Sequence, residues 1–185
     1  MKKVFKVIGI LVAVCVGLVL LFFAFVWGSL EWNRYSKKKE AIRMQKEVCD
    51  TITTTDGNFP LNVSGFTHQE LKKIKFYQKR NKYVIKDTTI KFVPEKDQET
   101  QTVIMPFKLL HIKDEIIVVI ANRTYLISGF SYIAAYNYGM FGPVGSCECR
   151  PTSYENVNGK PGGSGWLLKK EGMLNYQLPL KENRI

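Results

Sequence analysis

Histidine and cysteine are scarce in this 185-residue chain, which has two histidines and four cysteines. Any Ser-His-Asp or Cys-His catalytic arrangement would have to use His68 or His111, and neither lies in a nucleophile-elbow or protease motif. An activity has to be argued from a site, and no catalytic site is visible in the sequence. We therefore expect a protein that is not an enzyme and needs no cofactor.

Motifs for zinc, redox chemistry and phosphate are also lacking. Cys147 and Cys149 are closer in sequence than the Cys-x2-Cys pair of structural zinc sites, so a metal site that adds His68 or His111 is the weaker alternative. No Cys-x-x-Cys begins a helix. The glycine-rich stretch 158–165 has proline after its lysine, where a Walker loop needs Ser or Thr, and we interpret it as a hairpin loop.

Acidic residues are absent before Glu31, and no charge of either sign occurs from Val7 to Leu30. At about 1.5 Å per residue, a run of this length spans the roughly 30 Å hydrocarbon core of a bilayer. The run is longer than the apolar region of a signal peptide, and no small-residue cleavage site follows it. We expect an uncleaved transmembrane helix over 7–30, preceded by a basic tail over 1–6.

The flanking charges give conflicting signals about the orientation of this helix. Three lysines precede it, and six basic residues follow between Arg34 and Lys46. Counting these charges would place the domain in the cytosol, but long C-terminal domains are translocated largely regardless of charge. The opposite orientation would also carry a tail with three lysines across the membrane. We therefore expect a single-pass protein with its domain outside, in the periplasm or at the cell surface.

The segment that follows the apolar run is expected to be a stalk and linker over 31–59. Residues 31–48 are rich in helix formers and lack Gly and Pro, so the helix should continue. Trp32 and Tyr35 suit the lipid headgroup level. The lysines beyond them would either meet anionic lipid phosphates or stay solvated. Turn residues in 51–60 then open the domain.

From residue 60 onward, short runs rich in Val, Ile, Thr, Tyr and Phe replace the helical period. Strands are predicted at 61–66, 74–78, 83–92, 102–111, 116–122, 124–130, 131–138, 154–157, 166–170 and 174–180. Many short strands without a long amphipathic helix are typical of an antiparallel β-sandwich. The expected fold is therefore mainly β, with the sandwich domain over 60–185.

Two of these strands carry a clear burial pattern. Ile74 and Phe76 alternate with Lys73 and Lys75, which predicts one buried and one wet face. The run 116–120 is apolar at every position and should be buried on both faces. Two connections are interpreted as turns: a tight hairpin turn at 122–123, and the segment 67–70. Thr67 and Glu70 have capping-box spacing, but a plain turn between strands is the more economical reading.

Several short segments resemble, in their order along the chain, uncharacterised bacterial surface proteins with an immunoglobulin-like β-sandwich. The likeness spans residues 63–159. Those relatives are usually held by a lipidated cysteine, whereas this chain carries an uncut apolar span. The resemblance implies the fold and an extracytoplasmic setting, and it implies no activity. The segments are Val63-Ser64-Gly65-Phe66-Thr67, Glu70-Leu71, Ile74 to Tyr77, Asn122 to Ser128, Cys147 and Val157-Asn158-Gly159.

The domain and its stalk contain three cysteines: Cys49, Cys147 and Cys149. Thiols outside the cytosol tend to oxidise, so we expect Cys49 to pair with Cys147 or Cys149. That bond would close a loop of about 100 residues and contribute roughly 2–4 kcal/mol to stability. Cys147 and Cys149 do not readily pair with each other along a strand, because an extended i to i+2 span exceeds the usual Cα separation of a disulfide.

The net charge is +11, and many basic residues lie between residues 68 and 92. Alternation places Lys73, Lys75 and Lys79 on the wet face, and Lys82 follows in the turn. We predict that these four lysines bind an acidic protein or an anionic envelope polymer. Nucleic acid would suit this basic and aromatic stretch only in the cytosol. The alternative is a solvated face that protects a sheet edge.

Together these patterns favour a membrane-anchored extracytoplasmic β-sandwich domain that binds an acidic partner or an envelope component without catalysis. The alternative function is a membrane-anchored immunity or inhibitor protein that guards against an exported toxin. The genes beside this one would distinguish the two functions.

Overall fold

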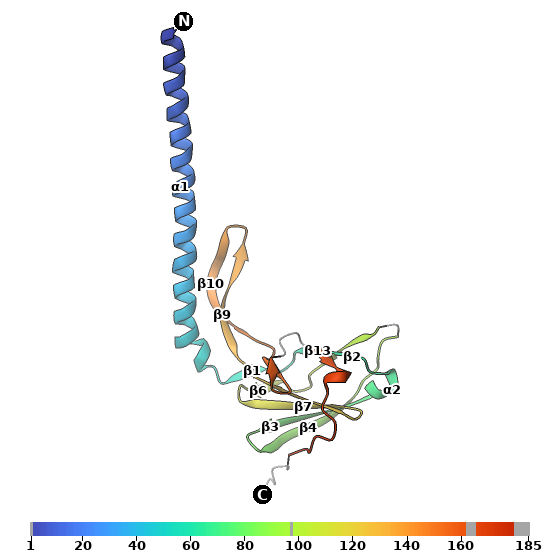
Figure 1. Ribbon diagram of the computed structural model, residues 1–185. Helices are drawn as coiled ribbons and strands as arrows, with labels where there is room; N and C mark the ends of the chain where they lie inside the picture. Colours follow the sequence, from blue (N-terminus) through green and yellow to red (C-terminus); the bar gives the residue numbers. More distant parts are fainter. Residues whose placement is uncertain (1, 97, 162–165, 180–185) are drawn as a thin grey trace.

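The computed structural model describes residues 2–96, 98–161 and 166–179, and in it a long helix stands beside a β-rich body (Figure 1). Helix α1 (Lys2–Glu47) is continuous, so it extends past the apolar run as the sequence predicts. It is long and apolar enough to cross a membrane, and its apolar window has 0% of its residues buried. The helix ends before the 3₁₀ turn η1 (Cys49–Thr51).

The body is mainly β, which confirms the expected class, and its largest sheet has six strands in the order β12-β11-β8-β7-β3-β4. All neighbouring strands in this sheet run antiparallel. The strands are β3 (Lys73–Arg80), β4 (Tyr83–Lys91), β7 (Asp114–Ile120), β8 (Arg123–Ser128), β11 (Asn156–Val157) and β12 (Lys160–Pro161).

A second sheet of three strands, in the order β13-β2-β5, lies across the apolar core from the first. Its strands β2 (Pro60–Ser64) and β5 (Thr100–Ile104) are antiparallel, but β13 (Trp166–Leu168) runs parallel to β2, so the expectation of a wholly antiparallel domain is wrong at this pair. The short strands β1 (Thr54–Asp56) and β6 (Leu109–His111) pair separately, which joins the expected linker to the body.

The core forms because apolar side chains on both sheets point toward one another. On β3 the pattern follows the predicted alternation, with Ile74 and Phe76 fully buried. Ile116 and Ile117 are neighbours on β7 and both are fully buried, as the apolar run predicts. The Tyr125 hydroxyl donates a hydrogen bond to the carbonyl of Leu168, at 2.8 Å, and so ties the two sheets together.

Several boundaries differ from the sequence-based expectations. The predicted strand 102–111 is divided into β5 and β6, because Met105 and Phe107 turn into the core instead of continuing a ladder. Residues 174–179 form no strand, and Leu180 lies outside the described residues. The predicted strand 166–170 ends early, in the 3₁₀ turn η2 (Lys169–Glu171).

Two connections also correct the expectations. The hairpin turn between β7 and β8 consists of Ala121 and Asn122, one residue earlier than predicted, because Ile120 pairs with Arg123 and Ala121 adopts a φ of 51°. The segment expected to be a plain turn forms α2 (His68–Leu71). The Thr67 side chain and the Glu70 side chain each cap the other residue's backbone amide, which is the capping box that stabilises this helical turn.

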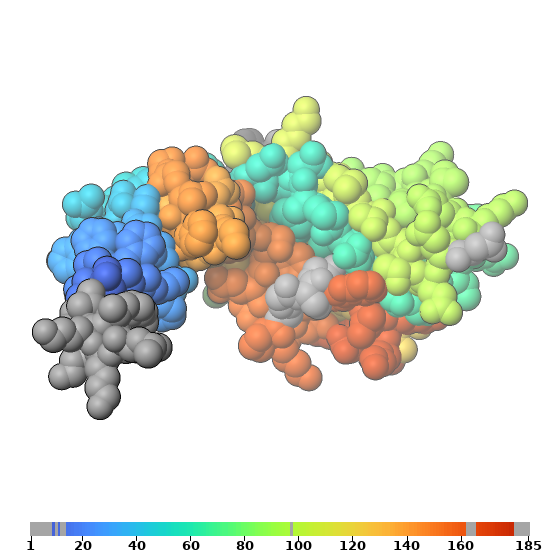
Figure 2. Space-filling view, turned by 90° about the horizontal axis from the view of Figure 1, so that it is seen from above, coloured from blue at the N-terminus to red at the C-terminus, as the bar shows by residue number. Residues whose placement is uncertain are grey.

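The hairpin of β9 (Tyr132–Gly139) and β10 (Gly142–Pro151) leaves the body and lies along α1 (Figures 1 and 2). Only β9 was anticipated, since Gly and Pro weaken the strand signal of β10. Below, the body means β1–β8 and β11–β13, and the stalk means the part of α1 from Glu31 to Glu47.

Candidate functional site

The predicted lysine surface lies on β3 and on β4, which is an edge strand of the six-stranded sheet. Lys73 and Lys75 are exposed on the outer face, opposite the buried Ile74 and Phe76. Lys91 of β4 pairs directly across from Lys73 and is also exposed. We call Lys73, Lys75 and Lys91 the lysine face.

The other two predicted lysines are placed differently. The ammonium group of Lys79 forms an ion pair with Glu115 of β7, and its side chain is only 19% exposed. Lys82 lies in the two-residue turn between β3 and β4, where Arg80 pairs with Tyr83. At about 3.3 Å per residue along a strand, Lys79 is roughly 20 Å from Lys73. The structure therefore groups two of the four predicted lysines and separates the other two.

Like charges directly opposite on adjacent strands are unfavourable, so the Lys73–Lys91 pair costs stability. Asp87 of β4 pairs with Tyr77 and is exposed on the same side of the sheet as the lysine face. Glu70 is close in sequence, but it is bound to Lys169 at 2.8 Å. That hydrogen bond from Lys169, followed by the one from the Thr67 backbone, lowers the pKa of Glu70. The lysine face thus carries three lysines, with one acidic residue, Asp87, on the same side of the sheet.

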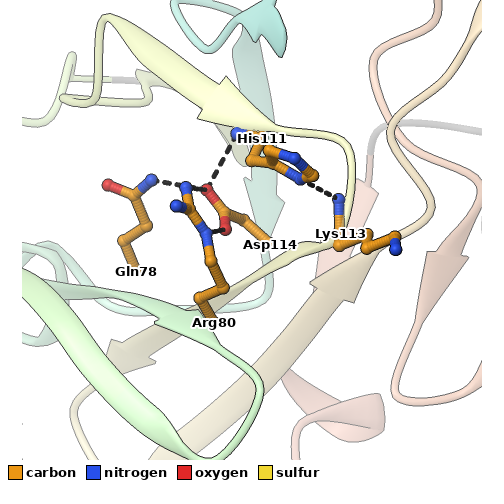
Figure 3. Close-up of polar contacts among 5 residues, drawn as sticks. All are labelled: Gln78, Arg80, His111, Lys113 and Asp114. Carbon is orange, nitrogen blue, oxygen red and sulfur yellow. Dashed lines mark hydrogen bonds and ion pairs between the residues drawn. The ribbon is translucent and has the colours of Figure 1, made fainter. Parts of the chain in front are cut away.

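A buried carboxylate fixes the opposite end of β3 (Figure 3). The Asp114 side chain accepts hydrogen bonds from Arg80 Nε at 2.6 Å and from Gln78 Nε2 at 2.6 Å, and it also accepts one from the His111 backbone amide at 2.8 Å. Burial raises the pKa of Asp114, but these hydrogen bonds outweigh it and the net pKa is lowered. The cluster is thus an ionised carboxylate with its hydrogen bonds satisfied, which locks the β6–β7 turn to β3.

A disulfide links the end of the helix to the hairpin. Cys49 and Cys149 are bonded, with their Cα atoms 5.4 Å apart, which is one of the two pairings expected from the sequence. Cys147 is a half-buried free thiol. Because Cys149 is already bonded, the alternative metal set of Cys147 and Cys149 is not available. His111 is also engaged, since its Nδ1 accepts a hydrogen bond from the Lys113 amide at 3.1 Å.

Polar contacts continue along the stalk from this disulfide. Gln45 donates from Nε2 to the Tyr132 carbonyl at 2.9 Å and accepts from the Ala134 amide at 2.8 Å. Its side-chain amide thus makes the two backbone hydrogen bonds to β9 that an adjacent strand would make. Further along, the Lys37 ammonium donates to the Gly145 carbonyl at 2.7 Å. We call the disulfide and these hydrogen bonds the clasp.

Tyr136 is the buried centre of the clasp. Its hydroxyl donates a hydrogen bond to the Glu40 carboxylate, and the Lys37 ammonium lies 4.5 Å from its ring centroid, in cation–π geometry. Burial, then the hydrogen bond to Glu40, raises the pKa of Tyr136. Sequence reasoning missed this group. The available signal was the absence of charge between Arg123 and Glu148, which sets the hairpin apart from the other strands of the domain.

Comparison with protein-family models, curated proteins and solved structures finds no match to this chain. The fold and surfaces described above therefore define it as a mainly β protein on a long apolar helix.

Proposed function

We propose that this protein is a single-pass membrane protein whose β body lies outside the cytosol and binds an anionic partner, an acidic protein or envelope polymer, without catalysis. The observation that carries the binding function is the lysine face, where the exposed side chains of Lys73 and Lys91 lie directly opposite each other on adjacent strands. A sheet edge can be protected by a single lysine. A directly opposed pair costs stability, and an anionic partner would offset that cost.

Two further features support the proposed membrane anchor and the location of the body outside the cytosol. The apolar part of α1 suits a membrane span in length and composition. The Cys49–Cys149 disulfide is of the kind that persists in oxidising compartments and is rare in the cytosol. The proposal therefore places the body on the oxidising side of the membrane.

The topology is tested by fusing alkaline phosphatase or a fluorescent protein to Ile185 of the full chain. The proposal expects an active phosphatase and a dark fluorescent protein, because the phosphatase needs an oxidising compartment and the usual fluorescent protein does not fold after export. A fluorescent fusion with an inactive phosphatase would place the body in the cytosol and overturn the proposed orientation.

The binding function is tested with the detergent-solubilised full chain and fluorescent poly-L-glutamate as an anionic probe. Changing Lys73, Lys75 and Lys91 together to Glu should abolish binding and its dependence on salt. The matched control changes Lys108, Lys113 and Lys160, which are exposed elsewhere, and alters the net charge equally. Equal losses in the two triple variants would mean that net charge alone attracts the probe, and the lysine face would not be a site.

A further inference from the structure

The tip of the β9–β10 hairpin differs from every other two-residue hairpin turn among the described strands. Gly139 pairs with Gly142, so the turn consists of Met140 and Phe141. The side chain of Met140 is 93% exposed and that of Phe141 is 64% exposed. The other such turns are Asn81–Lys82, Ala121–Asn122 and Asn158–Gly159, which follow the ordinary preference for small or polar residues.

Apolar exposure extends from the tip along both strands of the hairpin. Tyr138 on β9 is 79% exposed, and Val144 on β10 is exposed on the partner strand. The hairpin itself contributes no charged residue between Arg123 and Glu148, so its exposed side chains at the tip are uncharged. Single exposed apolar side chains are ordinary, but a contiguous apolar patch at a loop tip indicates a surface that contacts a membrane or another protein.

The clasp holds the hairpin so that its tip points toward the apolar end of α1. Successive contacts of the hairpin fall on Cys49, Gln45, Glu40 and Lys37, in decreasing residue number. At the tip, a side-chain atom added to Gly142 would lie 3.6 Å from Arg34. Figure 1 shows the hairpin running up the helix toward its N-terminus, and Figure 2 shows it against α1 when seen from that end.

The apolar run ends at Leu30, four residues before Arg34, which is about 6 Å along the helix axis. Trp32 and Tyr35 are exposed on the helix at the same level, where aromatic side chains favour the lipid headgroup region. Arg34 and Lys37 line the groove between helix and hairpin, and basic groups at this level are attracted to anionic headgroups.

We propose that the β9–β10 hairpin is a membrane-contacting finger, whose Met140 and Phe141 enter the interface of the bilayer that α1 spans. The proposal rests on the membrane anchoring given under the proposed function. The occupant of the patch is lipid because the clasp fixes the tip at the level where the apolar run meets its flanking aromatic residues. The finger gives the body a second point of attachment, so the body is held at a set tilt instead of swinging on a single helix.

The test uses the full chain in vesicles of phosphatidylcholine and phosphatidylglycerol, with the Cys49–Cys149 disulfide kept and Cys147 changed to Ser. The fluorophore NBD is attached to the native Cys15 in one protein. In two others Cys15 is changed to Ser, and NBD is attached through Met140→Cys or, as a matched turn control, Lys82→Cys. Each position is exposed, so labelling leaves the packing of the body intact. Quenching is measured with lipids that carry a nitroxide high on the acyl chain or near its end.

We expect the label at position 140 to shift to blue and to be quenched by the shallow nitroxide, while the label at position 82 stays unquenched. The label on Cys15 should be quenched most by the deep nitroxide. Quenching at Cys15 with none at position 140 would overturn the finger and leave the anchor intact. No quenching at Cys15 would overturn the anchor, and the finger with it.

A second copy of the chain is the competing occupant of the tip, and dilution of the protein in lipid tests it. Quenching at position 140 that is unchanged on dilution supports contact with lipid. A blue shift at position 140 that disappears on dilution, without quenching by lipid nitroxides, would overturn the proposal and assign the patch to contact between copies. The change Phe141→Ser in the labelled protein should reduce quenching at position 140, whereas Val93→Ser, at an exposed apolar position on the body, should not.

Discussion

The body and the clasp are held together by different forces. In the body, two sheets bury a continuous set of side chains such as Phe76, Tyr125 and Ile127, and the hydrophobic effect dominates. In the clasp, a disulfide joins the hairpin to Cys49 in η1, and the two hydrogen bonds of Gln45 and the Tyr136 hydroxyl join it to the stalk. The body should therefore stay folded under reducing conditions, although with lower stability, whereas the position of the hairpin should depend directly on the disulfide.

The largest effect is expected in the core of the body. Phe76 is fully buried and packs edge-on against Phe107, with ring centroids 6.5 Å apart. Phe76→Ala should lower the free energy of unfolding by about 3–5 kcal/mol, measured by urea denaturation under reducing and oxidising conditions. Val93→Ala, at an exposed position, serves as the control. A small loss at Phe76 would mean that the two sheets do not share a packed core.

The disulfide comes next. Changing Cys49 and Cys149 together to Ser should cost about 2–4 kcal/mol, because the bond closes a long loop in the unfolded chain. In native-state hydrogen exchange the amide of Ala134 should lose nearly all its protection, while amides of β3 and β7 should lose no more than the global cost of about 2–4 kcal/mol. Cys147→Ser should change neither. Equal loss of protection in β3 and β7 would erase the distinction between body and clasp.

The third effect is the contribution of the Asp114 carboxylate to folding stability, which should depend on pH. Asp114→Asn weakens its hydrogen bonds with Arg80 and Gln78 and should cost about 1–3 kcal/mol at neutral pH. The pKa of Asp114 is lower in the folded protein than its ordinary value of 3.8. Its contribution is therefore present above about pH 4 and is lost as the pH falls through the folded pKa.

The stability difference between the unmodified protein and Asp114→Asn should consequently shrink on acidification, as followed by urea unfolding at a series of pH values. Glu99→Gln, at an exposed position, is the control and should show a difference near zero throughout. A difference for Asp114→Asn that stays constant down to acid pH would contradict an ionised carboxylate with a lowered pKa.

Gln45 should show a smaller and purely local effect. Gln45→Ala removes two hydrogen bonds to the hairpin and should lower the opening free energy at Ala134 by about 1–2 kcal/mol, measured by hydrogen exchange. Urea unfolding of the body should not change. The matched variant Gln69→Ala, on exposed α2, should leave both measurements unaltered. A shift in the unfolding of the body by Gln45→Ala would show that the clasp and the core are coupled.

The smallest effect has the opposite sign. Lys91→Glu replaces a like-charge pair across from Lys73 with an opposite-charge pair, and it should stabilise the body by about 0.2–1 kcal/mol. The same change should weaken binding of poly-L-glutamate. Lys113→Glu, exposed elsewhere, provides the control for both measurements. Stabilisation without loss of binding would mean that the lysine face only protects a sheet edge and is not a binding site.

Local periodicity explains which parts of this structure could be predicted. The long helix, the alternation of β3 and the double-sided burial of β7 each follow from the pattern of side chains within one segment. The clasp could not be predicted in this way, because Gln45 and Lys37 contact residues 87 and 108 positions away. The hairpin strand β10 also contains Gly142, Pro143 and Gly145, which hide the strand signal.

The lysine face was only half predictable for a geometric reason. Counting back from the Asn81–Lys82 turn without a bulge would set Lys73 opposite Ile90. A register shift between Gln78 and Lys79 moves the pairing by one residue and brings Lys91 opposite Lys73 instead. A β-bulge of this kind leaves no reliable mark in a single sequence. Lys79 was misplaced because its partner, Glu115, comes from a distant strand.

The most direct test of the account is to map the thiols of the protein in its native membrane, alkylating whole cells before lysis and analysing non-reduced peptides by mass spectrometry. We predict a linked pair of peptides that contain Cys49 and Cys149, together with an alkylated Cys147. Alkylated Cys49 and Cys149 would instead place the body in a reducing compartment. That result would contradict both the proposed orientation and the attachment of the hairpin to the stalk.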